Sequence, residues 1–320
     1  METADFMPNE AVIAGLRKNI EAYEAQRASA HRRTRWRVPL FIGLVLVFVA
    51  FVAWLFNGVA DPNEQWFSTP HVFLYIGGFL AAILLYFQAI KPARKLQQSF
   101  RSTLLPIIFG FIDYRHNVKP NSFDRLPRET VGPFNQQSFD DVFSGRYEGF
   151  PFELYEANLR EGTGKSTTVV FKGVIVAFET IVPFPGTLVA ARRTNKVLGF
   201  FRGIFGSKMQ ELSSGVPELD AAYEFRTDNI EAARPLVTGR LAQALEWLGE
   251  TWPKEPARVA LNGSDGFLLL PQTKNFFELP DISVPLDYVK HVAPMIADMG
   301  TILATAALVR KIGAQDEDAG

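Results

Sequence analysis

Two long apolar runs constrain this chain more than any other feature of its sequence. Residues 38–56 read VPLFIGLVLVFVAFVAWLF and residues 72–90 read VFLYIGGFLAAILLYFQAI, and neither run contains a charged residue. A helix of about 19 residues, rising ~1.5 Å per residue, is just long enough to span the ~30 Å hydrocarbon layer of a bilayer. We therefore predict one transmembrane helix over residues 38–56 and a second over residues 72–90.

A cleaved secretory signal is the alternative for the first run, because the small residues Gly58 and Ala60 follow it. Signal peptides have shorter apolar cores and shorter N-terminal regions than this segment. Here residues 1–37 precede the run. We interpret the run as a membrane anchor that stays in the protein.

Basic residues near the two runs are distributed unevenly. The loop between the runs, residues 57–71, contains Asp61 and Glu64 but no Lys or Arg. The outer flanks carry the bases Arg32, Arg33, Arg35, Arg37, Lys91, Arg94 and Lys95. Because Lys and Arg concentrate on the cytoplasmic side of membrane proteins, we predict that both termini are cytoplasmic and that the loop is external.

Helical patterns continue on both flanks of the predicted spans. Residues 1–37 are predicted to form a cytoplasmic amphipathic helix, and residues 91–116 a second cytoplasmic helix that Pro106 disturbs. The first of these predictions rests on apolar residues at helical spacing, which are Val12, Ile13, Leu16, Ile20 and Tyr23.

Small residues form one face of the second predicted span. Gly77 and Ala81 lie four residues apart, as do Gly78 and Ala82. We interpret this face as the surface that packs against the first span. A transport role is disfavoured, because ion pathways normally need ionisable residues and neither run carries a charged one.

The rest of the chain has the pattern of one α+β domain. Residues 117–144 are rich in Pro, Asn, Gln and Arg and are predicted to be a linker or irregular segment, whereas residues 145–312 are predicted to form a cytoplasmic domain with a mainly antiparallel sheet. Both alternating sets of residues in TTVVFKGVIVAFET are apolar, which is typical of a central strand. The acidic residues 313–320 are expected to be a loose tail.

Individual residues predict finer details of this domain. Asp228 and Thr238 are expected to cap two helices, because their side chains accept hydrogen bonds from free backbone N–H groups. Gly263 and Gly266 in RVALNGSDGFLLLP indicate a hairpin turn. Gly173 is typical of a strand position that another backbone approaches closely. A last long helix is predicted over the apolar residues before the acidic tail.

The stretch EGTGKSTT resembles the end of a nucleotide-binding loop. Such a loop has the spacing G-x-x-x-x-G-K-[ST], and position 159, where its first glycine belongs, is Leu159. A phosphate-binding loop also leads into a helix, whereas the residues that follow here are β-branched. We interpret the stretch as a hairpin turn and expect no nucleotide.

Residues that commonly perform catalysis or bind metals form no recognisable set. The chain has no Cys and only 4 His, and no two of the histidines form an H-E-x-x-H motif or an i, i+4 pair. His116 and Asp113 lie at helical spacing, and a capped helix end or a surface ion pair explains them more simply than acid–base chemistry. We assign no catalytic residue, no cofactor and no metal site.

A basic segment rich in Phe follows the strand-like region, and no acidic residue occurs between Glu179 and Glu211. Three interpretations compete: a core helix with solvated bases, a segment that binds the anionic membrane surface at ~1 kcal/mol per base, and a nucleic-acid-binding segment, which lacks a fold signature. The candidate contact residues for membrane or partner are Arg192, Arg193, Lys196, Phe200, Phe201, Arg202, Ile204, Phe205 and Lys208.

Two segments after the predicted spans, FKGVIVAFE and FRTDNIEAARPLVTGRLAQALEWL, resemble bacterial membrane proteins of domain of unknown function family 3137. The residues that carry the resemblance are Phe171, Gly173, Phe225, Asp228, Ala233, Arg234 and Leu236. The resemblance covers about residues 145–280 and implies a multi-pass protein of the bacterial inner (cytoplasmic) membrane with a cytoplasmic α+β domain. It implies no catalytic residue, because the family has no established activity.

These features together favour a membrane-anchored cytoplasmic binding or scaffolding module. Its expected partners are the lipid bilayer, anionic lipid headgroups and a protein, and no nucleic acid is expected. The alternative is a membrane-tethered hydrolase or transferase whose site combines scattered carboxylates with Arg234 or His116.

Overall fold

The computed structural model describes residues 10–58, 69–109, 112–164, 166–193, 209–252, 257–272, 277, 280 and 283–311. The chain divides into two compact units. A helical unit comprises Glu10–Ile107 and Leu279–His291, and an α+β unit comprises Met1–Asn9, Ile108–Glu278 and Val292–Gly320.

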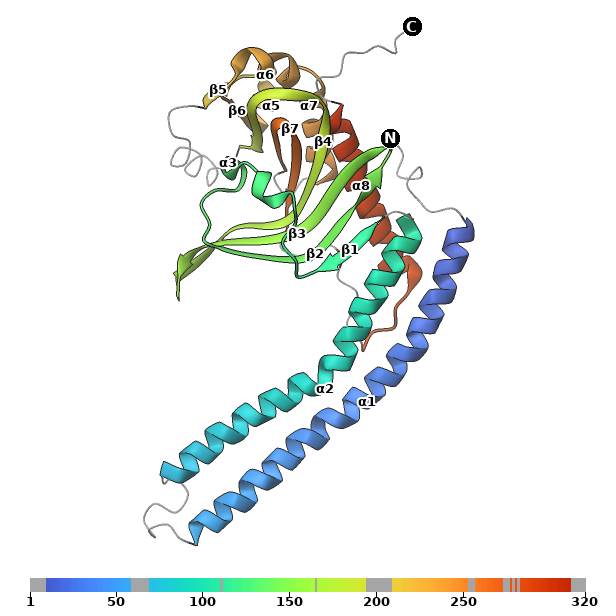
Figure 1. Cartoon of the computed structure of the whole chain (residues 1–320), viewed down its shortest axis with the longest axis vertical. Coiled ribbons are helices and arrows are strands. Elements are labelled where there is room, and N and C mark those ends of the chain that lie inside the picture. The colour runs from blue at the N-terminus through green and yellow to red at the C-terminus, as the bar shows by residue number, and fades with distance from the viewer. Residues whose placement is uncertain are drawn as a thin grey trace. The chain divides into compact units, whose positions relative to one another are not determined.

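Two long helices, α1 (Glu10–Asn57) and α2 (Thr69–Phe109), make up most of the helical unit (Figure 1). α1 continues through Pro39 without a break, so the predicted amphipathic helix and the first predicted span form one continuous helix. Two of the contacts between α1 and α2 show how closely these helices pack. Tyr23 stacks on Phe100 with ring centroids 4.3 Å apart, and Gly78 faces Val49 so closely that an added Cβ atom would lie 2.5 Å from a methyl carbon.

The Gly78 contact confirms the expected packing role for one of the two small-residue positions. The Cβ position at Gly77, in contrast, has no atom within 4 Å. At one end of the helix pair, the fully buried His71 lies with Nε2 3.0 Å from the carbonyl oxygen of Ala53. The small-residue face therefore contacts the other helix through Gly78 and not through Gly77.

Three helices of the described residues are long and apolar enough to cross a membrane, one more than the sequence analysis predicts. The apolar windows of the helices Glu10–Asn57 and Thr69–Ala93 are each only 6% buried, whereas that of Tyr288–Arg310 is 72% buried. Most of the apolar window of the third helix is therefore covered by protein. It begins with a π-helical turn, η3 (Tyr288–Val292), and continues as α8 (Ala293–Arg310).

The α+β unit contains one antiparallel sheet with the strand order β1-β2-β3-β4-β6-β5, and β7 pairs with β4 as well. This confirms the predicted α+β class and the mainly antiparallel sheet. The strands are β1 (Asp113–His116), β2 (Gln136–Tyr147), β3 (Phe150–Thr163), β4 (Ser166–Arg192), β5 (Gln210–Leu212), β6 (Tyr223–Thr227) and β7 (Arg258–Pro271). The remaining helices are η2 (Phe123–Arg125), α3 (Arg128–Val131), α5 (Pro217–Ala222), α6 (Ile230–Val237) and α7 (Arg240–Thr251).

β4 is the central strand, as predicted, and apart from the exposed Lys172 both of its faces are buried over residues 171–178. On one face, Phe171, Ile175 and Ala177 join a core that also contains Phe123 and Val131 from the segment around η2 and α3. The opposite face carries Val174, Val176 and Phe178, all buried. On this side α8 contacts β4 and β7, and the guanidinium of Arg310 lies 5.0 Å from the ring centroid of Phe150. The sheet is thus covered on both sides (Figure 1).

The sheet begins earlier in the chain than predicted. α2 ends at Phe109, and the residues from Asp113 to His116 form β1, so the helix predicted over residues 91–116 is wrong at its C-terminal end. β2 then begins at Gln136, inside the segment expected to be irregular over residues 117–144. Edge strands are short and partly exposed, so β1 lacks the apolar alternation by which strands are detected.

The β3–β4 connection is the hairpin that the sequence EGTGKSTT predicts. Thr163 pairs with Ser166, and Gly164 has the left-handed φ of +62° that such a tight turn uses. Lys165 lies outside the described residues. A strand follows this turn where a nucleotide-binding loop would have a helix.

β7 is one continuous strand, so the hairpin predicted at Gly263 and Gly266 is wrong. Its pairing with β4 is irregular between Glu179 and Thr187. Pro183 lies in that stretch and cannot donate a ladder hydrogen bond, so the pairing is interrupted there. Gly263, which pairs with Phe184 inside this stretch, has a left-handed φ of +57°.

The predicted helix caps are each displaced by one residue. Asn229 caps α6 by accepting a hydrogen bond from the N–H of Ala232 at 3.2 Å, while Asp228 accepts one from the N–H of Thr187 at 2.7 Å. Gly239 precedes α7, and Thr238 ends α6. Asp228 therefore ties α6 to β4 instead of capping a helix.

Glu153 on β3 fixes the segment that leads into η2. Its carboxylate accepts hydrogen bonds from the N–H and hydroxyl groups of Ser122, from the N–H of Asn121 and from the guanidinium of Arg115. Burial on its own would raise the pKa of Glu153, but the hydrogen bonds from Ser122, Asn121 and Arg115 outweigh it and hold the pKa below its ordinary value. The ionised carboxylate thus stabilises this covering segment on the sheet.

Gly173 of β4 is predicted to tolerate no side chain. A Cβ atom there would lie 2.1 Å from the carbonyl oxygen of Leu270, and its φ is +156°. Gly173→Ala should therefore lower the free energy of unfolding by about 2 kcal/mol or more. The measurement is thermal unfolding of the detergent-purified full-length protein.

Gly249→Ala in α7 is the matched control. The nearest atom to its Cβ position is 4.0 Å away, so this substitution should be neutral or stabilise by up to about 1 kcal/mol through helix propensity. Equal unfolding temperatures for the two variants would contradict the close approach of β7 at Gly173.

Candidate functional site

Two adjacent aspartates, Asp140 and Asp141, lie at an irregularity in β2. Phe139 pairs with Ala157 and Val142 pairs with Tyr155, so two residues of β2 stand opposite the single residue Glu156 of β3. Such a β-bulge bends a strand and redirects its side chains. On the other side of β2, Asp141 pairs with His116 of β1.

This arrangement brings both aspartates to His116. The Nδ1 atom of His116 lies 3.1 Å from Oδ1 of Asp140 and 3.4 Å from Oδ1 of Asp141. The side chain of Asp141 is fully buried, and its Oδ1 also accepts a hydrogen bond of 2.6 Å from the hydroxyl of Tyr114. Asp113, which the sequence analysis paired with His116, lies at the other end of β1 and contacts Arg115 at 3.7 Å.

A cavity of about 400 Å³ lies beside this cluster. Glu156 is 9% exposed, and its Oε1 accepts a hydrogen bond of 3.3 Å from the N–H of Phe277. The cavity thus combines two carboxylates with an amine, which is a set able to bind a polar ligand or a cation. It is lined by Asn117, Ser138, Phe139, Asp140, Glu156, Ala157, Asn158, Lys172, Gly173 and Val174.

The candidate contact segment predicted from the sequence lies mostly outside the described residues. This applies to Lys196, Phe200, Phe201, Arg202, Ile204, Phe205 and Lys208. Arg192 is the last residue of β4, and Arg193 follows it. The structure therefore describes only the two ends of the segment.

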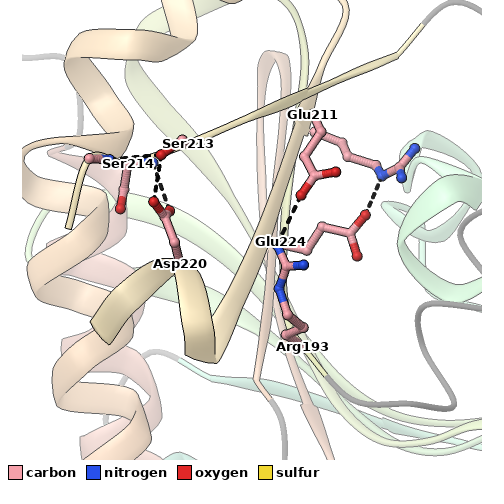
Figure 2. A network of polar contacts seen from close by, with 8 residues as sticks. Arg193, Glu211, Ser213, Ser214, Asp220 and Glu224 are labelled. Carbon is pink, nitrogen blue, oxygen red and sulfur yellow. Dashed lines mark hydrogen bonds and ion pairs between the residues drawn. The ribbon is translucent and has the colours of Figure 1, made fainter. Parts of the chain in front are cut away.

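An ion pair joins the two ends of the segment at the edge of the sheet (Figure 2). Arg193 donates to a carboxylate oxygen of Glu211 at 2.9 Å, which links the end of β4 to β5. Beside this pair, Nε of Arg226 donates to the nearly buried carboxylate of Glu224 at 2.6 Å. Figure 2 also shows Asp220 facing two serines of the turn after β5.

Asp220 accepts hydrogen bonds from the hydroxyl of Ser213 and from the N–H of Ser214, at 2.5 and 2.7 Å. Burial would raise the pKa of Asp220, but these bonds outweigh it and lower the pKa. The turn therefore holds an ionised carboxylate. Its role is structural, because both serines also bond within the turn itself.

A second groove lies in the helical unit, at the basic end of the first apolar run. It has a volume of about 710 Å³. Trp36 is 75% exposed, and Arg32 and Arg35 are exposed as well. This groove combines bases with an aromatic ring at the position where a membrane surface is expected. It is lined by Arg27, Ala28, His31, Arg32, Arg35, Trp36, Pro39 and Ser283.

The residues that the sequence analysis considered for catalysis lie in different environments in the structure. His116 belongs to a cluster of ionisable groups, whereas Arg234 is exposed on α6. Sequence reasoning missed Asp140 and Asp141. The signal that could have found them is two consecutive aspartates inside an otherwise strand-like stretch, SFDDVF, because Asp is depleted in strands.

Comparisons with known proteins leave the family open. No family model matches the chain, and no curated protein matches it. Among solved structures, a crystal structure of the mycobacterial trehalose monomycolate transport factor A aligns with a TM-score of 0.32 and 11% sequence identity, over 61% of this chain and 88% of that chain. A similarity this weak supports no conclusion about fold or function. The resemblance to domain of unknown function family 3137 stays a prediction.

Arg193 and Arg226, which form the two ion pairs described above, should contribute unequally to the free energy of unfolding. Arg226→Met would leave the carboxylate of Glu224, whose side chain is 2% exposed, without its ion pair, at a cost of about 3–5 kcal/mol. Arg193→Met removes a pair whose side chains are 33% and 53% exposed and should cost less than about 1 kcal/mol. Thermal unfolding of both variants measures the difference. A larger loss for Arg193→Met would refute this ranking.

Proposed function

We propose that this protein is a two-span protein of the bacterial inner membrane that holds an α+β binding or scaffolding domain at the cytoplasmic surface. The uncovered apolar surface of α1 and α2 carries the proposal. Large apolar side chains from Leu40 to Phe56 and from Val72 to Phe87 are exposed, which is costly in water and favourable in lipid. α8 is not counted as a span, because its apolar window is mostly covered by protein.

The cytoplasmic orientation is supported by charge. Four arginines precede the first apolar run and three bases follow the second, while the loop over residues 57–71 has no base. In this orientation the basic groove around Arg32, Arg35 and Trp36 lies at the inner surface of the membrane. Exposed Trp residues favour such interfaces.

Anionic lipid headgroups are the proposed ligand of this surface. Bases beside a cytoplasmic leaflet each contribute ~1 kcal/mol of attraction to anionic lipid. The groove provides Arg32 and Arg35, and the segment over residues 192–208 adds five further bases by sequence. A protein partner bound by the α+β domain completes the proposed scaffolding role.

The proposal predicts selective retention of phosphatidylglycerol over phosphatidylcholine by the full-length protein in mixed micelles. Arg32→Gln with Arg35→Gln should lower retention by about 30-fold, since two bases contribute ~2 kcal/mol. Native mass spectrometry of the purified protein counts the retained lipids.

Two further variants separate the contributions. Arg202→Gln with Lys208→Gln tests the segment predicted from the sequence. Arg33→Gln with Arg37→Gln removes the same charge from a neighbouring groove on α1, so an equal loss of retention would assign the effect to the overall charge of this flank, and a smaller loss to the groove around Trp36. Equal retention of the two lipids by the unmodified protein would rule out an anionic-lipid role.

A membrane-tethered enzyme is the second candidate function, and the cavity of about 400 Å³ favours it, because Asp140, Glu156 and Lys172 converge there. For a hydrolase, turnover of a phosphomonoester, ester or glycoside substrate should be lost in Glu156→Gln and kept in Asp113→Asn. Turnover that is the same in both variants would place any activity elsewhere.

A further inference from the structure

We propose that His116, Asp140 and Asp141 bind one divalent transition-metal cation, with Mn²⁺ and Zn²⁺ as the best-suited ions. The site is independent of the proposed membrane function. Its three side chains offer one imidazole nitrogen and two carboxylate oxygens, and these atoms all lie within 4.8 Å of one another. Imidazole suits Zn²⁺ and related ions, while carboxylate oxygens suit Mn²⁺, so the mixed set favours these two over Mg²⁺ or Ca²⁺.

The spacing of the three atoms fits a shared cation. Neighbouring ligands on bonds of ~2.1 Å are about 3.0 Å apart at a right angle and about 3.4 Å apart at a tetrahedral angle. The distances from Nδ1 of His116 to the oxygens of Asp140 and Asp141 are 3.1 and 3.4 Å. The imidazole nitrogen is therefore already at the separation from each carboxylate oxygen that one metal ion requires, and the two oxygens lie within 4.8 Å of each other.

The Nδ1 atom of His116 is the second observation that indicates a ligand. This atom is shielded from solvent and makes no hydrogen bond, although both carboxylate oxygens lie close to it. The contacts thus have the distance of hydrogen bonds without their direction. A cation placed between the three atoms would use the nitrogen lone pair and balance the carboxylate of Asp141, which is fully buried.

The fold holds the ligands in place before any ion binds. The bulge in β2 brings the side chains of two consecutive residues to His116, and β1–β2 pairing sets His116 opposite Asp141. The hydroxyl of Tyr114 donates to Asp141, and the N–H of Asn117 donates to the carbonyl of Asp140 at 2.9 Å. The bond from Tyr114 is of the kind that orients a metal ligand and raises metal affinity, and the bond from Asn117 fixes the backbone at Asp140.

The adjoining cavity supplies the rest of the coordination shell. Three protein ligands leave at least one position open, as in sites where a metal also contacts water or a substrate. Asp140 lines the cavity of about 400 Å³, so it faces both the ion position and this space. Water or the oxygen of a small ligand in the cavity would complete the shell.

The competing explanation is a protonated His116 held between two aspartates with no metal. Both explanations place the same residues together. They differ in two measurable ways. Only a metal site binds Mn²⁺ with one-to-one stoichiometry, and only a metal site places an imidazole nitrogen on the bound ion.

The test uses the full-length protein, purified in detergent and stripped with a chelator. Isothermal titration with Mn²⁺ and with Zn²⁺ should give one site, and pulsed electron paramagnetic resonance of the Mn²⁺ form should show coupling to one imidazole nitrogen. His116→Gln should abolish that coupling and weaken Mn²⁺ binding by at least the ~10-fold to 100-fold that loss of a mere outer-shell partner causes. Asp140→Asn should weaken binding by a similar factor.

Two choices keep the result interpretable. Asp113→Asn alters an exposed carboxylate on the same strand and should bind Mn²⁺ like the unmodified protein. Asp141 is left unchanged, because its buried carboxylate also stabilises β1 through Tyr114. Absence of Mn²⁺ and Zn²⁺ binding at millimolar concentration, or unchanged binding and nitrogen coupling in His116→Gln, would overturn the proposal.

Discussion

Backbone pairing along β4 is the interaction on which the α+β unit depends. β4 is 27 residues long, and three strands bond to it: β3 along its first half, β6 at its end and β7 along much of its length. Its apolar residues on both faces then require cover from two sides. The segment around η2 and α3 covers one face and α8 covers the other. The bulge that presents Asp140 and Asp141 also belongs to this sheet, so the cluster around His116 depends on the same pairing.

The three apolar helices are similar in composition and differ in what covers their apolar side chains. α1, α2 and α8 are each long and apolar enough to cross a membrane. In α8 the apolar side chains are buried in protein, with Ile296, Met299 and Ile302 completely covered. In α1 and α2 the corresponding side chains are exposed, and water would oppose that exposure at about 25 cal/mol per Å². A lipid environment removes this cost, and the membrane proposal follows from that argument.

Sequence patterns predicted the features whose signal is local. β4 is recognisable because both of its faces are apolar, the β3–β4 hairpin because of its turn residues, and the role of Gly173 because a glycine inside a strand indicates close approach. The sequence predicts a hairpin where β7 is continuous, because Gly263 lies opposite the irregular stretch of β4 that contains Pro183, far away in sequence. Pairing between distant segments produces little signal in the local sequence pattern.

The candidate site was only partly predictable for the same reason. His116 was noticed, but the helical spacing that linked it to Asp113 does not apply in a strand. Its actual neighbours, Asp140 and Asp141, are brought to it by antiparallel pairing and a bulge. Composition alone does not show which residues a sheet places side by side. The basic segment was predictable as a charge pattern, and its contacts fall outside the described residues.

Chemical labelling of single cysteines tests the central claim most directly, because the chain contains no cysteine of its own. Asn63→Cys lies in the predicted external loop, and Thr168→Cys is exposed on the α+β unit. In spheroplasts treated with a membrane-impermeant maleimide, the account predicts labelling of Asn63→Cys, and labelling of Thr168→Cys only after the membrane is permeabilised. Labelling of Thr168→Cys in intact spheroplasts, or failure to label Asn63→Cys there, would contradict a two-span anchor with a cytoplasmic domain.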